Sequence, residues 1–160
     1  MRGPRQRLAF IGLFDRTIAM DTPLGELRYL YVGSAEFDRD RGYYRDTLGA
    51  EPVWEFAHFG ARVAALRLGP GPLILLADHR PAPSCMPIFE VDNLAAAERT
   101  LTERGWKPDQ AKFEIPNGPC YVFSDPSGNS YAIFENVRPQ AMEKAYSDPD
   151  NTHAVRDKPE

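Results

Sequence analysis

The stretch FSDPSGNSYAIFE, residues 123–135, joins a tight turn to a β-strand. Its Asp-Pro and Ser-Gly-Asn segments are turn-forming, because glycine and asparagine tolerate positive φ angles. After the turn, successive side chains point to opposite sides at the period of two that is typical of a strand. One side of this strand carries Ser130, Ala132 and Phe134. What that side faces is the main question for function.

The same order of elements occurs twice along the chain. In the first half a strand precedes a helix that three strands follow, at 27–34, 35–49, 51–59, 61–68 and 72–79. The second half repeats this order at 86–91, 94–104, 106–115, 118–125 and 129–135. Ser34 is placed to cap the first helix, and Asn93 or Asp92 the second. Gly49 and Gly105 are placed to end them.

Two such units predict an α+β fold. A single strand–helix–strand–strand–strand unit, βαβββ, covers only one face of its sheet with its helix, so the other face needs a partner. Pairing the two units gives a curved mixed sheet around a cleft, with both helices outside.

The pattern also sets the domain boundaries. We expect one domain over 25–137, made of a first repeat at 25–80 and a second at 85–137. Residues 1–24 are then an N-terminal extension, and residues 138–160 form a polar tail that we expect to be mobile.

Composition excludes several classes of partner. A net charge of −4 does not favour nucleic-acid binding, which usually shows a basic surface. No apolar run reaches the length of a membrane-spanning helix, so we expect no membrane partner. Two cysteines, Cys85 and Cys120, are too few for a disulfide framework. A cytoplasmic location is therefore expected.

Three segments stand out in this pattern: GYYRDTLGAEPVW (42–54), EVDNLAAAERTLTERGW (90–106) and FSDPSGNSYAIFE (123–135). Their order and spacing resemble the vicinal oxygen chelate superfamily, which includes glyoxalase I, extradiol dioxygenases and bleomycin-resistance proteins. With the strands between them, the resemblance covers roughly 25–137. Because many members pair, it also implies a homodimer.

In that family a divalent metal usually lies in the cleft, held by His or Glu from the first and last strand of each repeat. The matching positions here are Leu27, Met86, Ala132 and either Leu75 or Ile74. All of these are apolar, whereas hard divalent ions need several oxygen or nitrogen ligands. We therefore expect no metal site and no cofactor.

Strand alternation instead predicts an aromatic, mostly uncharged cleft that suits a small, partly aromatic organic ligand. The predicted ligand-binding residues are Leu27, Tyr29, Tyr31, Trp54, Phe56, Met86, Ile88, Tyr121, Ala132 and Phe134. The inward face is left open for the strands of Trp54 and Tyr121. Aromatic residues on a strand face are equally consistent with an ordinary core.

Glu90 and His58 are the candidate catalytic residues. A carboxylate in an apolar cleft can serve as a general base, and a histidine as a general acid or base. The simpler interpretation is that Glu90 is solvated near a strand end and that His58 is a surface residue.

Three functions follow from these residues. The first is metal-independent binding of a small molecule, for resistance or sequestration. The second is a metal-independent lyase, isomerase or cyclase that uses Glu90 or His58. The third is a metalloenzyme with shifted ligands at His58, His79 and Glu90, which no spacing in the sequence recommends.

Overall fold

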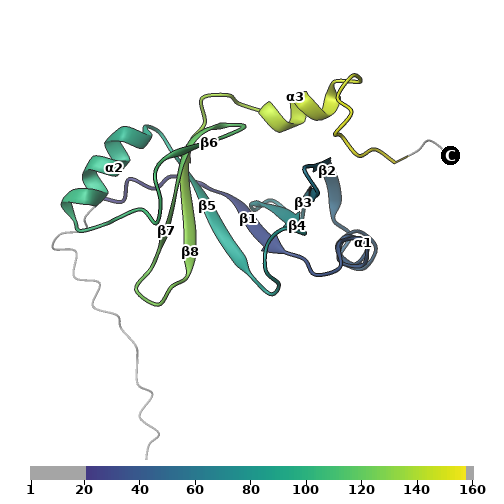
Figure 1. Ribbon diagram of the computed structural model, residues 1–160, viewed down its shortest axis with the longest axis horizontal. Coiled ribbons are helices and arrows are strands. Elements are labelled where there is room, and N and C mark those ends of the chain that lie inside the picture. Colours follow the sequence, from purple (N-terminus) through teal and green to yellow (C-terminus); the bar gives the residue numbers. More distant parts are fainter. Residues whose placement is uncertain (1–20, 158–160) are drawn as a thin grey trace, which may run out of the picture.

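The computed structural model describes residues 21–157, which fold into one eight-stranded sheet with helices around it (Figure 1). The elements are β1 (Leu27–Gly33), α1 (Phe37–Gly42), η1 (Tyr43–Thr47), β2 (Glu51–His58), β3 (Ala61–Arg67), β4 (Leu73–Ala77), β5 (Cys85–Val91), α2 (Leu94–Glu103), β6 (Phe113–Ile115), β7 (Gly118–Ser124), β8 (Ser130–Glu135) and α3 (Ala141–Ser147).

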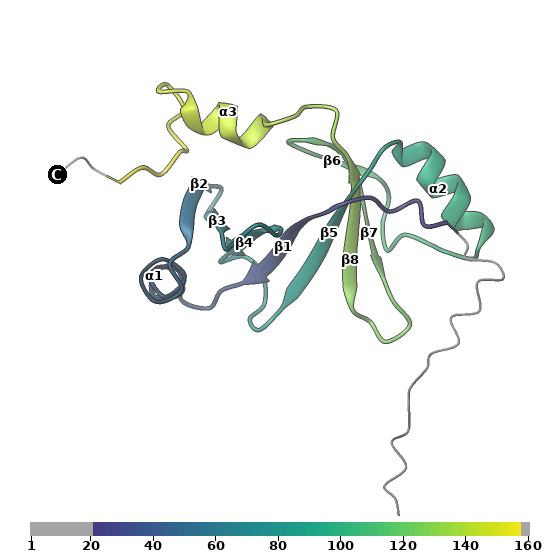
Figure 2. The ribbon, with the colours of Figure 1, turned by 180° about the vertical axis from the view of Figure 1, so that it is seen from behind.

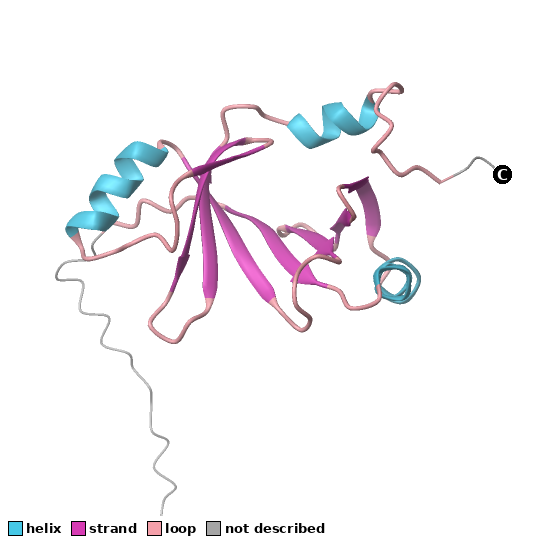
Figure 3. Ribbon diagram, in the orientation of Figure 1, coloured by secondary structure: helices cyan, strands magenta, loops and turns pink. Residues whose placement is uncertain are grey.

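The strand order is β2-β3-β4-β1-β5-β8-β7-β6, which places the two βαβββ units side by side. Within each unit the first and last strands pair in parallel, β1 with β4 and β5 with β8. The units join through the antiparallel pair β1 and β5. The sheet curls, and α1 and α2 lie outside it (Figures 2 and 3). The predicted fold class is confirmed.

The opening stretch forms its turn around one carboxylate. Asp125 Oδ1 accepts hydrogen bonds from the backbone N–H groups of Ser127 and Asn129, at 3.0 and 2.9 Å. Hydrogen bonds from Asn129 hold the pKa of Asp125 below its usual value. Gly128 has a φ of +89°, which glycine adopts without strain. The turn therefore delivers the chain directly into β8.

The first helix is shorter than the sequence predicts. Residues 35–49 do not form one helix, because α1 ends at Gly42 and continues as the π-helical turn η1. Ser34 does not cap the backbone, and its hydroxyl donates to Asp40 Oδ2 at 2.6 Å instead. Leu48, near the end of the predicted helix, is 45% exposed. A glycine at the junction offers little resistance to this change in helical geometry.

The second helix follows its prediction closely. Asn93 is the N-cap, and its side chain accepts the Ala96 N–H at 2.8 Å. Glu135 Oε1 accepts the Leu94 N–H at 2.9 Å, so the end of β8 also holds the start of α2. Glu135, whose side chain points away from the cleft, thus links the start of α2 to the sheet.

The strand predicted at 106–115 is mostly a loop, and only Phe113–Ile115 pairs with β7. Trp106 turns back to pack edge-on against Tyr121 and Phe123, at 5.6 Å between ring centroids in each case. Pro108 has no N–H to contribute to a ladder, which favours a loop here.

The C-terminal segment differs from the predicted mobile tail. Met142 and Tyr146, four residues apart on α3, pack on the β2 side of the molecule. Further on, the Ala57 N–H donates to the His153 carbonyl at 2.9 Å, so the chain runs along the edge of β2. An i, i+4 apolar pair in a polar segment was the signal for this docking.

Residues 1–20 of the predicted N-terminal extension lie outside the described residues. Of the remainder, Leu24 packs against the apolar cluster beneath α2. No helix within 21–157 is long and apolar enough to span a bilayer.

Buried side chains separate into clusters on the two sides of the sheet. One outer cluster lies beneath α1 and contains Phe37, Ala64, Leu66 and Leu76. The other lies beneath α2 and contains Val91, Leu94, Ala97 and Ile133. Two further clusters form the inner, concave side. The outer clusters stabilise the sheet, which leaves the inner side available for a site.

Candidate functional site

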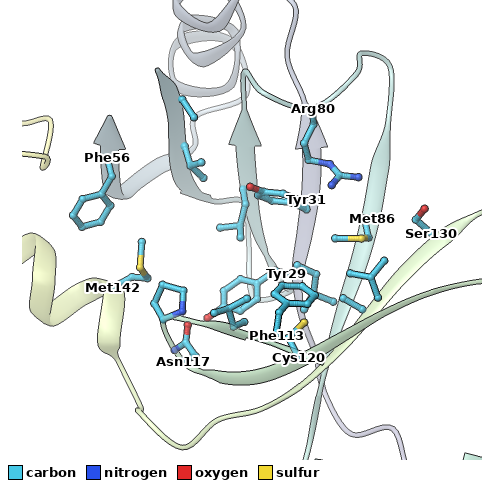
Figure 4. Close-up of a pocket in the computed structure, with 18 of the residues that line it drawn as sticks. Tyr29, Tyr31, Phe56, Arg80, Met86, Phe113, Asn117, Cys120, Ser130 and Met142 are labelled. Carbon is cyan, nitrogen blue, oxygen red and sulfur yellow. The ribbon is translucent and has the colours of Figure 1, made fainter. Parts of the chain in front are cut away.

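The concave side of the sheet holds a cavity of about 690 Å³ (Figure 4). Side chains from all eight strands line it, together with Met142 of α3 and Arg80 of the link between the halves. This volume lies within the range of pockets that bind organic molecules of drug size.

The structure brings eight of the predicted site residues together on this lining. They are Tyr29, Tyr31, Trp54, Phe56, His58, Met86, Ile88 and Ala132. The register explains the grouping, because Ile88 pairs with Ala132 and Ala132 pairs with Val122 across three neighbouring strands. The face of β2 that the sequence left open, with Trp54 and Phe56, points inward.

Phe134 lies on the inner side but beneath the cavity wall. It is fully buried within a cluster that includes Met86 and Ala132. Its ring centroid is 5.9 Å from that of Tyr29. Phe134 therefore supports the wall and does not face the cavity.

Tyr121 lies on the opposite side of the sheet from its predicted position. Its neighbours Cys120 and Val122 line the cavity, so the period of two directs Tyr121 outward. There it packs with Trp106 beneath α2. The sequence predicts Tyr121 among the ligand-binding residues but leaves the inward face of its strand open, because alternation alone does not say which face is the inner one.

Leu27 is also absent from the cavity lining. The β1–β5 register shifts between Leu27 and Tyr29, so that Leu27 pairs with Phe89, a residue of the cluster beneath α2. Such a bulge interrupts the alternation of side chains along the strand, so Leu27 does not take its predicted position on the cavity lining. Of the two alternatives on β4, Leu75 lines the cavity and Ile74 packs beneath α1.

Glu90 forms an ion pair instead of lining the cavity. Its Oε2 lies 2.5 Å from Arg28 Nε. The hydrogen bond to Glu90 raises the pKa of Arg28. Because Glu90 is paired with Arg28 and lies outside the cavity lining, it is not placed to take a proton from a molecule bound in the cavity.

His58 lies on the lining where β2 meets the C-terminal segment. Its ring stacks between Phe59 and His153, with centroid distances of 3.7 Å to each. Phe59 is 93% exposed, so this end of the cavity opens toward solvent. His58 is accessible to a bound molecule and to water.

A tyrosine, a histidine and an arginine meet at the end of β1, a group that the sequence did not identify. The Tyr31 hydroxyl lies 2.8 Å from His79 Nε2, and the Arg80 guanidinium carbon lies 4.8 Å from the Tyr31 ring centroid. Burial raises the pKa of Tyr31, partly opposed by Arg80, so the phenol stays neutral. The signal available in the sequence was the pair His79 and Arg80, which comes one residue after the end of β4.

Other polar lining residues were missed because they lie in loops. The long connection before β6 supplies Asp109 and Gln110, and the turn before β7 supplies Asn117. Figure 4 shows Asn117 and Arg80 at different ends of the cavity. Between them the wall is apolar, and burial raises the pKa of the Cys120 thiol to about 11.

The residues present do not fit a divalent metal ion. Met86, Ala132 and Leu75 occupy the positions that correspond to the family's ligands, and none is a hard donor. No group of three or more His, Cys, Asp or Glu side chains with metal-binding geometry lies within the described part of the chain. The three residues of the alternative ligand set, His58, His79 and Glu90, each contact a different partner. His58 stacks on His153, His79 shares a hydrogen bond with Tyr31, and Glu90 forms an ion pair with Arg28.

Comparison with known proteins gives a consistent result for the fold. Residues 30–133 match the family model described as Glyoxalase/Bleomycin resistance protein/Dioxygenase superfamily. No match was found among curated protein sequences.

Solved structures of other proteins are also similar to this chain. Methylmalonyl-CoA epimerase from Mycobacterium tuberculosis is 20% identical with a TM-score of 0.60, covering 76% of this chain and 94% of that one. The Mn(II)-bound glyoxalase from Novosphingobium aromaticivorans is 20% identical with a TM-score of 0.56, covering 73% of this chain and 40% of that one. At these identities the likeness is one of fold.

Proposed function

Since this chain belongs to the Glyoxalase/Bleomycin resistance protein/Dioxygenase superfamily, we propose that it binds a small, partly aromatic organic molecule in its cavity without a metal ion. The observation that carries the proposal is the cavity of about 690 Å³ with aromatic side chains on its wall. Pockets of this size and lining bury most of a ligand's surface.

The cavity wall presents aromatic rings on one side and aliphatic side chains on the other. Tyr29, Tyr31 and Phe56 present aromatic rings, while Met86 and Ile88 present flexible or branched aliphatic groups. Each well-placed aromatic pair contributes about 0.5–1.5 kcal/mol beyond the area that it buries. These contacts add to the burial of apolar area, and the two together must supply the roughly 8 kcal/mol that micromolar binding requires.

The test is a titration with aromatic molecules and hydrophobic dyes, read by tryptophan emission. Trp54 lines the cavity and Trp106 lies on the other side of the sheet, so a Trp106→Phe variant isolates the reporter. We expect saturable changes that are the same in metal-depleted and metal-supplemented protein. A panel without any saturable change, or a strict need for added metal, contradicts the proposal.

A role in resistance or sequestration predicts that the ligand leaves the protein unchanged. Mass spectrometry of the recovered ligand after long incubation measures this directly. The family resemblance also motivates a cytoplasmic homodimer as part of this proposal. Light scattering at micromolar protein concentration tests the dimer, and a monomer mass contradicts it.

A second candidate, a metal-independent enzyme, is favoured by the position of His58 on the cavity wall. The M. tuberculosis protein of the same fold is a methylmalonyl-CoA epimerase, so in that protein the fold belongs to an enzyme. Here His58 would act as the general acid or base.

This candidate predicts a chemically altered ligand and loss of conversion in His58→Gln with binding retained. We expect Glu90→Gln to convert normally, because Glu90 lies outside the cavity in its pair with Arg28. Conversion that survives His58→Gln but is lost in Glu90→Gln reverses these roles.

A further inference from the structure

Arg80 brings a positive charge into a cavity whose lining is mostly apolar. It follows β4 in the link between the two halves, and its guanidinium lies over the Tyr31 ring at 4.8 Å. Figure 4 shows it reaching over Tyr31 toward the Met86 side of the cavity. Among the described residues that line the cavity, Arg80 is the single lysine or arginine.

This guanidinium has no carboxylate partner within the described part of the chain, and its Nε is buried without a hydrogen bond. Two partly buried arginines elsewhere are paired, since Arg41 and Arg62 both contact Glu55, at 2.7 and 3.3 Å. A buried donor without a partner is costly, and a charged one more so. Contact with the Tyr31 ring compensates for only part of this cost.

We infer that Arg80 is the anion-binding residue of the cavity and that the ligand is an aromatic carboxylate. The inference deepens the proposed function and rests on it. A carboxylate matches the planar guanidinium through two parallel N–H···O bonds. The aromatic body of the ligand then extends along Tyr31 and Met86 into the apolar part of the cavity.

The charges on the wall favour a singly charged ligand. Arg80 supplies one positive charge, and Asp109 is the one Asp or Glu among the described lining residues. A doubly charged phosphate would leave one negative charge uncompensated in an apolar site. A single carboxylate neutralises the Arg80 guanidinium, and the negative charge of Asp109 further disfavours a second negative charge on the ligand.

Tyr31 and His79 act as positioning residues in this arrangement. The hydrogen bond of 2.8 Å between the Tyr31 hydroxyl and His79 Nε2 holds the ring on which Arg80 rests. A supporting ring keeps the guanidinium in one orientation and lowers the entropy lost when a carboxylate binds. The contact is thus preformed for its ligand.

The test compares matched ligands by isothermal titration calorimetry on the full chain at pH 7. The probes are indole-3-acetic acid, 2-naphthylacetic acid and biphenyl-4-carboxylic acid, each with its neutral primary amide. We expect the wild-type protein to bind at least one acid tenfold or more tightly than its amide. In Arg80→Gln this preference disappears, and in Arg80→Lys a part of it remains.

Arg99→Gln is the matched control, because Arg99 is exposed on α2 outside the sheet and the variant loses the same charge. It should keep the full preference for the acid. Equal binding of acids and amides by the wild type, or an equal loss in the Arg99 variant, overturns the role of Arg80 and leaves the proposed function standing. Absence of binding by both series overturns the proposed function as well.

Discussion

The two halves of the molecule share one backbone plan but hold their outer elements in place by different interactions. In the first half, Glu55 of β2 binds Arg41 of α1 through both carboxylate oxygens, at 2.7 and 2.9 Å, and Arg62 of β3 at 3.3 Å. In the second half, Trp106 packs edge-on against Tyr121 beneath α2. Beyond the apolar cluster beneath each helix, the first half thus adds an ionic contact and the second half an aromatic one.

The inner faces of the two halves also differ, but in another respect. The first half lines the cavity mainly with large rings, and the second half, apart from Phe113, mainly with smaller groups such as Met86, Ile88 and Ala132. Because the walls are unequal, a flat ligand has a preferred side on which to stack. The repeat therefore duplicates the architecture, and the chemistry of each half is set by its side chains.

The largest expected effect is in the second half. Trp106→Ala should lower the free energy of unfolding by about 3 kcal/mol, because it removes most of a large aromatic contact. Trp106→Phe should cost far less, since the indole N–H is buried without a partner in the described residues. Urea unfolding of both variants measures the difference, and equal losses contradict the packing role.

The two cysteines provide the next comparison. Burial raises the pKa of Cys120 from 9.0 to about 11, whereas Cys85 is exposed. A thiol with a higher pKa holds less thiolate at pH 8, here by about 100-fold. We expect iodoacetamide to modify Cys85 much faster than Cys120, as mass spectrometry of each peptide will show. Similar rates would mean that the inner wall is open to reagent and water.

The ionic contact of the first half is expected to contribute somewhat less. Glu55→Gln leaves Arg41 and Arg62 without their common anion, and we expect a loss of about 2 kcal/mol because both arginines remain partly exposed. Glu51→Gln is the control, since its contact with Arg67 is long and exposed at 3.9 Å. Added salt should narrow the difference between Glu55→Gln and wild type, and a loss independent of salt argues against an electrostatic origin.

The smallest effect concerns the helix caps. Asn93→Ala removes the side-chain cap of α2 and should cost about 1 kcal/mol. Glu36→Ala, at the corresponding position of α1, should have little effect because Glu36 makes no capping hydrogen bond. Thermal unfolding of both variants checks this, and equal losses would show that the two helix starts are equivalent.

Local signals were sufficient for much of the fold. Period-two strands, the Asn93 cap and the turn at Asp125 depend on neighbouring residues, so they can be recognised without distant contacts. The same alternation correctly grouped Met86 and Ile88 on one face. The docked segment with Met142 and Tyr146 was missed because its stability comes from β2, far away in the sequence.

The sequence by itself determined that two βαβββ units pair and that the positions matching the family's metal ligands are apolar. Both properties depend only on the type and order of the residues. Only the tertiary structure decided that Tyr121 faces α2, that a bulge removes Leu27 from the wall, and that Arg80 reaches the cavity. The register between strands and the path of the links depend on the packing of the whole sheet, which no short window of sequence contains.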